Sequence, residues 1–192
     1  MGHALRSRFE PSPPALLEVV EHLWQMKRSG VGLLERWISQ TVDSDTRAGL
    51  GSQIGDERRH YRLMGEQAMR LGGRLPVRPQ QEALTRLFAE IEALTADLDR
   101  FCAFHRGVKL FTVDRCSHLI PVVDESLAET LETLVHEDER HIRWADTRLE
   151  RLLTYETMRA CNLTMGRMRT VLEAAWEQPW QRLMRGRERR VE

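Results

Sequence analysis

The sequence predicts an all-α protein: a four-helix bundle made of two repeated helical hairpins, with a further helix at the C-terminal end. Apolar residues recur at spacings of three and four along most of the 192 residues, whereas alternating or β-branched runs between turns are scarce. In addition, the charged hexapeptide at 57–62 has a near copy at 138–143. A duplicated helical hairpin is the simplest explanation, and two antiparallel hairpins joined by a crossover form a four-helix bundle.

The first hairpin is bounded by ordinary helix signals. A serine followed by two prolines at 12–14 predicts the start of a helix that runs to about Gln40. Asp43 or Ser44 caps a second helix, which the glycine pair at 72–73 ends.

The second hairpin follows a connector that contains glycine and proline. Its first helix is predicted from about Gln80 to His118, with Gly107 as a candidate break. Asp124 caps the next helix, which continues to about Tyr155. A shorter fifth helix then closes the domain.

The chain is long enough for one domain with a full core. The fifth helix is expected to end near Ala175, before Pro179. The expected organisation is an N-terminal extension over 1–13, a helical domain over 14–176 and a basic C-terminal tail over 177–192.

The charge balance argues against a protein drawn to nucleic acid or anionic lipid as a whole. The chain holds 29 basic and 29 acidic side chains, with 41% apolar and 30% charged residues. The exception is the tail, where five arginines fall between Arg182 and Arg190. A solvated end is the ordinary interpretation, and contact with RNA, phosphate or a partner is the alternative.

The cysteines and the apolar runs indicate a soluble cytoplasmic protein. Cys102, Cys116 and Cys161 are odd in number, widely spaced and without a paired motif, which favours reduced thiols. The N-terminal residues lack the apolar segment of a signal peptide. No stretch approaches the ~18–20 apolar residues that cross a bilayer.

The two hexapeptides, ERRHYR and DERHIR, place acids inside apolar stripes. Glu57 and Asp138 lie 81 residues apart, and each takes a position within an apolar stripe that steps along its helix by three and four residues. His60 and His141 follow three residues later, on the same helix face. Each turn therefore offers an oxygen and an imidazole nitrogen together.

Such a pattern needs a buried positive charge. An isolated carboxylate in a bundle core costs several kcal/mol because nothing replaces its water. Two carboxylates at equivalent levels are best explained by a shared divalent metal ion. The ordinary alternative for a single Glu-x-x-His is a solvated edge or an ion pair with an arginine, and Arg59 and Arg140 are expected to pair with acids of neighbouring helices, fixing the orientation of the ligands.

With these residues, the chain resembles the ferritin-like superfamily of di-metal carboxylate proteins, in which two helices carry Glu-x-x-His and two others carry one Glu each. The acid-x-Arg-His form at 57–60 and 138–141 is similar to that of stearoyl-type desaturases and related di-iron oxygenases. The resemblance covers roughly residues 15–155 in architecture, but only the two hexapeptides as motifs.

The resemblance implies further ligands on the first and third bundle helices. On the first helix Glu21 is the nearest acid to the expected level, with Glu18 and Glu35 as weaker candidates. On the third helix no glutamate stands at the expected level, and His105 takes an inward position there. Asp99 as ligand, recruitment of Glu137, and His105 as a hydrogen-bonded core residue remain open.

The resemblance also implies a function. It predicts an oxidoreductase that holds two iron ions, with manganese or zinc as alternatives, and activates dioxygen to oxidise a small organic substrate or iron itself. A homodimer through the outer helix faces is consistent with this family. The competing hypothesis is a scaffold or partner-binding bundle whose metal site is degenerate, its acids neutralised by Arg59, Arg140 or protons, with the basic tail as the contact surface.

Overall fold

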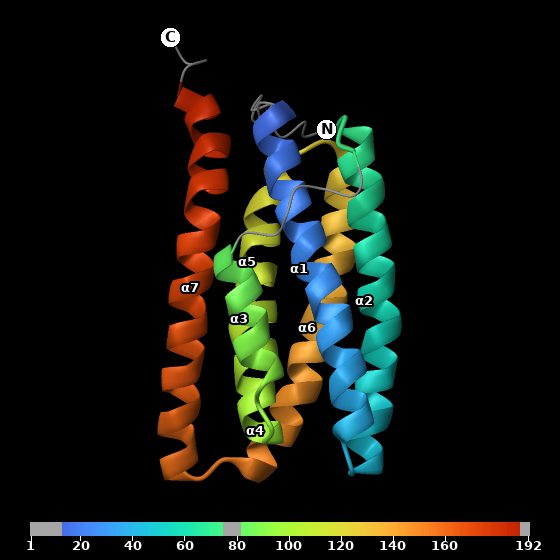
Figure 1. The fold of residues 1–192 in the computed structure, drawn as a ribbon. Helices are drawn as coiled ribbons and strands as arrows, with labels where there is room; N and C mark the ends of the chain where they lie inside the picture. Colours follow the sequence, from blue (N-terminus) through green and yellow to red (C-terminus); the bar gives the residue numbers. More distant parts are fainter. Residues whose placement is uncertain (1–12, 75–81, 189–192) are drawn as a thin grey trace, which may run out of the picture.

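The computed structural model describes residues 13–74 and 82–188, and those residues form helices and short connections without any strand. The all-α prediction is therefore confirmed for this part of the chain. The helices stand side by side as long rods (Figure 1). The ferritin-like assignment within the all-α class remains a prediction.

The first hairpin consists of α1 (Pro13–Gln40) and α2 (Ser44–Arg70), close to the predicted bounds. The side chain of Asp43 caps α2 by accepting a hydrogen bond from the backbone N–H of Thr46 at 2.7 Å. At the other end Gly72 adopts φ = 89°, a left-handed conformation that closes the helix and that glycine adopts without strain.

The third bundle helix departs from the prediction of one helix broken at Gly107. After α3 (Glu82–Glu92) the chain turns at 93–96 and continues as α4 (Asp97–Arg100), a π-helix η1 (Phe101–Lys109) and α5 (Leu110–Leu119). The break comes before 97 because Arg100 holds the turn: its Nε donates to the backbone oxygen of Leu94 at 2.8 Å.

The last two helices are α6 (Glu125–Leu152), reached through the short 3₁₀ turn η2 (Ile120–Val122), and α7 (Tyr155–Glu188). Asp124 caps α6 as predicted. The expected end of the fifth helix before Pro179 is wrong, because α7 continues through that proline. Packing offsets the hydrogen bond that the proline removes, since Trp176 and Leu183, one turn to either side, are buried against the bundle.

The site lies in the bundle formed by α1, α2, α6 and the third helix, η1 with α5. Helix α7 lies along the outside of this bundle (Figure 1), where it packs mainly on η1 and α1. Over the described ranges, none of the helices has an apolar stretch long enough to cross a membrane. The predicted basic tail falls partly on α7, where Arg182 pairs with Glu18; the side chains beyond residue 184 and the extension over 1–12 lie outside the described residues.

Cys102 and Cys161 form a disulfide, which corrects the expectation of three reduced thiols. The two residues are 59 apart in sequence, but η1 and α7 lie side by side and bring their Cα atoms to 5.6 Å. Cys116 stays free and buried, and burial raises the pKa of its thiol to about 12. Only the packing of α7 on the third helix reveals this pairing.

Candidate functional site: a buried centre of carboxylates and lysines

The two predicted acids face the interior of the bundle. Glu57 on α2 and Asp138 on α6 are each 1% exposed, and His60 and His141 beside them are also buried. The prediction that all four side chains point into the core is therefore confirmed. Their role as metal ligands remains a prediction.

Two lysines meet these acids in the core. Lys27 on α1 is 4% exposed and Lys109, the last residue of η1, is 2% exposed. One charged group thus comes from each of the four bundle helices. These four residues, Lys27, Glu57, Lys109 and Asp138, are called the charged centre below.

Each ammonium group contacts both carboxylates. Lys27 Nζ lies 2.5 Å from Asp138 Oδ2 and 3.5 Å from Glu57 Oε2. Lys109 Nζ lies 2.6 Å from Asp138 Oδ1 and also bonds Glu57 Oε1. Each carboxylate therefore bridges two cations, one oxygen to each, and the four formal charges of the centre cancel.

Lys109 also bonds a histidine. Its Nζ lies 3.1 Å from Nδ1 of His141, so three acceptors surround one ammonium group: Glu57 Oε1, Asp138 Oδ1 and His141 Nδ1. An ammonium group has three N–H donors, and these acceptors match them in number. The hydrogen bonding of Lys109 is therefore complete inside the bundle.

The pairing keeps the acids ionised despite their burial. Burial alone raises the pKa of Glu57, but the nearby charges of Lys109 and Lys27 outweigh it and hold this pKa well below the ordinary range. The pKa of Asp138 is lowered through the same balance. For Lys27, burial lowers the pKa, and the attraction of Asp138 and Glu57 raises it above its ordinary value.

A second layer of acids orients the histidines. His60 Nε2 lies 2.7 Å from Oε2 of Glu137, and His141 Nε2 lies 3.0 Å from Oδ2 of Asp56. Asp56 directly precedes Glu57 on α2, and Glu137 directly precedes Asp138 on α6. Each histidine therefore bonds an acid of the other helix. A ring that donates from Nε2 to a carboxylate carries its lone pair on Nδ1.

The arginines of the hexapeptides hold these orienting acids. Arg140 Nη2 lies 2.6 Å from Asp56 Oδ2, and Arg59 bonds Glu137 and lies 3.1 Å from Asp56 Oδ1. The pKa values of Asp56 and Glu137 are lowered: burial raises them, and the hydrogen bonds from the histidines and arginines outweigh it. The prediction that Arg59 and Arg140 pair with acids of a neighbouring helix is confirmed.

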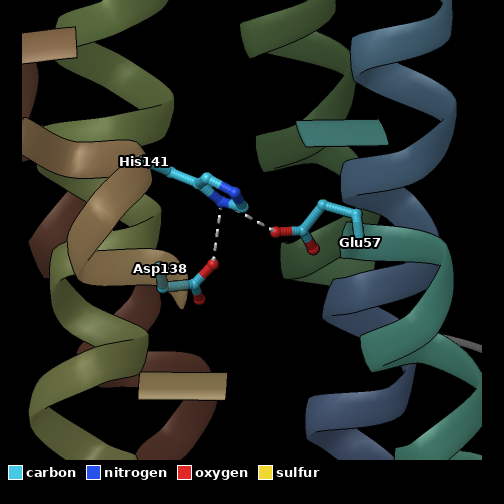
Figure 2. A group of neighbouring side chains, drawn as sticks. All are labelled: Glu57, Asp138 and His141. Atoms are coloured by element: carbon cyan, nitrogen blue, oxygen red, sulfur yellow. Dashed lines mark ion pairs between the residues drawn. The ribbon is translucent and has the colours of Figure 1, made fainter. Parts of the chain in front are cut away.

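Part of this arrangement could hold a metal ion. One ligand atom each from Glu57, Asp138 and His141 lies within 4.8 Å of the others, and Figure 2 shows the three side chains converging from α2 and α6. His60 Nδ1 is buried without a hydrogen-bond partner, 3.7 Å from Glu57 Oε1. The donor types and their orientation suit a transition metal.

The lysines, however, do not fit a pair of divalent ions. The three atoms that Lys109 Nζ bonds lie close together, as the ligand atoms of one metal ion would. His141 Nδ1 lies 3.5 Å from Asp138 Oδ1 and 3.9 Å from Glu57 Oε1. A metal ion there would displace Lys109. A second ion between Oε2 and Oδ2 would displace Lys27, and each displaced lysine would lose the two carboxylates that pair with it in the core.

The other predicted ligands lie elsewhere. Glu21 on α1 is half-buried and does not belong to the group of converging ligand atoms. His105 is fully buried, with Nε2 at 2.8 Å from Oε1 of Gln53, and burial lowers its pKa well below the ordinary value. His105 thus takes the open alternative of a hydrogen-bonded core residue.

The alternative acids also have other surroundings. Glu18 pairs with Arg182, and Glu35 pairs with Arg58 at 2.6 Å. Asp99 is half-buried and lies outside the converging group, while Glu137 orients His60. Among the described residues, the first and third bundle helices therefore contribute lysines where the resemblance implied acids.

Sequence reasoning missed Lys27 and Lys109, although two signals mark them. They lie 82 residues apart, nearly the offset of 81 between Glu57 and Asp138. They are also the only lysines of the chain, the other 27 of its 29 basic residues being arginine. An ammonium is a compact point charge with three rotatable donors, whereas a guanidinium is a larger, planar fork.

Comparisons with protein-family models, with curated proteins and with solved structures return no match for this chain. The interpretation of the charged centre therefore depends on the residues and their geometry.

Proposed function

We propose that this protein is a non-catalytic binding protein, built on a bundle of the ferritin-like kind in which two lysine ammonium groups take the place of two metal ions. One observation carries the proposal: Lys109 Nζ bonds the same three residues, Glu57, Asp138 and His141, that could hold a metal ion. The centre then stabilises the bundle, and function belongs to the surface.

Charge supports this proposal. The centre is neutral as it stands, so one divalent ion would add two positive charges to a buried site. Uptake would be favourable only if the lysines lost their protons or left the core. The raised pKa of Lys27 opposes proton loss, and the contacts of Lys27 and Lys109 oppose departure.

The surface supports it as well. The largest exposed apolar side chains near the start of α7 are Tyr155, 84% exposed, and Leu163, 68% exposed. A hollow of about 540 Å³ lies between η1, α5 and α7, and its lining includes none of the four residues of the charged centre. Exposed apolar surface of this kind marks interaction sites.

Metal analysis combined with melting tests the proposal. Protein purified without chelator is analysed for iron, manganese and zinc, and its melting temperature is measured with EDTA and with each ion added. We expect much less than one ion per chain and no shift of the melting temperature. Stoichiometric metal together with metal-dependent stabilisation of the wild type would overturn the proposal.

A second candidate is a metal-dependent oxidoreductase. The observation that favours it is His60 Nδ1, buried without a partner beside Glu57 while Glu137 holds the other ring nitrogen. Iron bound by Glu57, Asp138 and His141 would supply the capacity to activate dioxygen. The same measurement decides between the two candidates, because only this one requires an ion that raises the melting temperature.

A further inference from the structure

The hollow between the third bundle helix and α7 has the size of a ligand site. Its volume of about 540 Å³ lies within the range of roughly 300–1,000 Å³ typical of small-molecule pockets. Most of the surface of its walls is apolar, with Leu110 and Phe111 on one side and Met165 on the other. Leu110 is 44% exposed, so the hollow opens to solvent.

Three contacts along the two helices fix their spacing around the hollow. The Cys102–Cys161 disulfide joins η1 to α7, about one turn of η1 before the hollow begins at Arg106. Further along, a Cβ atom at Gly107 would lie 3.0 Å from Cβ of Met168, so the absence of a side chain lets the helices touch. Beyond that, the rings of Phe111 and Trp176 meet edge to face at 5.9 Å. The hollow is therefore a preformed feature.

Arginines stand on both walls. Arg106 comes from η1 and Arg169 from α7. Their ion pairs with Asp146 and Glu173 are made through Nε, at 2.5 Å and 2.8 Å, and neither of those acids lines the hollow. The Nη groups form the outer edge of a guanidinium, where a carboxylate binds in the two-point manner. Asp114 is the one acid of the lining. With two arginines and one aspartate, the lining residues together carry a positive formal charge.

We infer that this hollow binds a small amphipathic anion, with an apolar chain or ring against Leu110, Phe111 and Met165 and a carboxylate on Arg106 or Arg169. The inference rests on the proposed binding function and names its ligand class. An apolar wall without a cation would favour a neutral ligand equally, and the two arginines provide the preference for an anion.

Binding of decanoate tests the inference, with decanol and decyltrimethylammonium as neutral and cationic probes of equal chain length. Calorimetry on the intact chain should show decanoate binding with a preference of about tenfold or more over both analogues, the size expected of one charge-assisted hydrogen bond. Equal binding of the three probes, or none, would overturn the inference.

A variant that fills the hollow, its matched control and arginine substitutions locate the site. Gly166 lines the hollow, and a Cβ atom there meets nothing within 4 Å, so Gly166→Trp is expected to fold and to reduce decanoate binding at least about tenfold by occupying the hollow. Gly55→Trp is the matched control, since Gly55 also has open space but lies on α2. Arg106→Ala and Arg169→Ala test the two cations separately, and at least one of them should abolish the preference for decanoate over decanol. Unchanged binding in Gly166→Trp with an intact melting transition would place the ligand elsewhere and reject the site, whatever the metal content.

Discussion

Lys109 Nζ and Asp138 Oδ1 lie 2.6 Å apart in the middle of the bundle, in an ion pair that is almost completely shielded from water. This ion pair joins the third helix to α6, because burial of either charge without the other would be strongly unfavourable. The same lysine contacts α2 through Glu57. The charged centre thus ties the helices together.

Removal of one ammonium group should destabilise the fold strongly. Lys109→Met keeps the volume but leaves two carboxylates with one lysine, and we expect a loss of about 3–5 kcal/mol in the free energy of unfolding. Denaturant unfolding measures it. The charge-matched control is Lys109→Met with Glu57→Gln, which restores neutrality and should recover part of the loss. A single variant as stable as the wild type would show that the pair contributes nothing.

Replacement of both lysines by glutamate should create a metal site. The variant Lys27→Glu with Lys109→Glu presents four carboxylates and two histidines, one acid from each bundle helix, which is the ligand set of di-metal bundles. Without metal its melting temperature should fall below that of the wild type. With Co²⁺ or Mn²⁺ it should rise, whereas the wild type stays unchanged. If metal has no effect on the variant, the lysines do not occupy metal positions.

Stability should be greatest between mildly acidic and moderately alkaline pH. The folded-state pKa values of Glu57 and Asp138 are lowered, so their contribution is present above the ordinary carboxyl pKa of ~4 and is lost as pH falls through the folded values. The pKa of Lys27 is raised, so its contribution is present below ~10.4 and is lost as pH rises through the folded value.

A buried histidine should extend the acid-side loss. Burial lowers the pKa of His22 from 6.5 to about 4, partly opposed by Glu18. The unfolded chain therefore binds more protons between these values, and stability should fall as pH decreases from 6.5 to about 4. His22→Phe should reduce this slope, as measured by urea unfolding across the range. A slope identical to that of the wild type would contradict the assignment.

Reduction of the disulfide should loosen α7. The bond between Cys102 and Cys161 closes a loop of 59 residues, for which chain entropy predicts a contribution of about 4 kcal/mol. Melting with and without dithiothreitol measures the loss. Thiol titration of the unfolded, unreduced protein should find one group, Cys116. Three reactive thiols before reduction would show that the pair is not formed.

The helices were largely predictable because their signals are local. The caps Asp43 and Asp124 and the left-handed Gly72 act within a few residues, so the bounds of α1, α2 and α6 follow from sequence. Where packing outweighed local preference, prediction failed: α7 continues through Pro179, and the third helix is interrupted before Asp97 and contains a π-helix over Phe101–Lys109, where a break at Gly107 was the expectation.

By itself the sequence determined that two acids and two histidines occupy the core, since the 3.6-residue period assigns a helix face without any knowledge of the partner helix. Which cation meets those acids was decided by tertiary structure alone. The level of Lys27 and Lys109 depends on the turns between helices and on the π-helix, whose wider i→i+5 turns shift each following side chain around the axis. Six residues separate the expected Glu21 from Lys27, and four separate His105 from Lys109. Small errors in register accumulate along long helices, whereas contact between charges acts over a few ångströms.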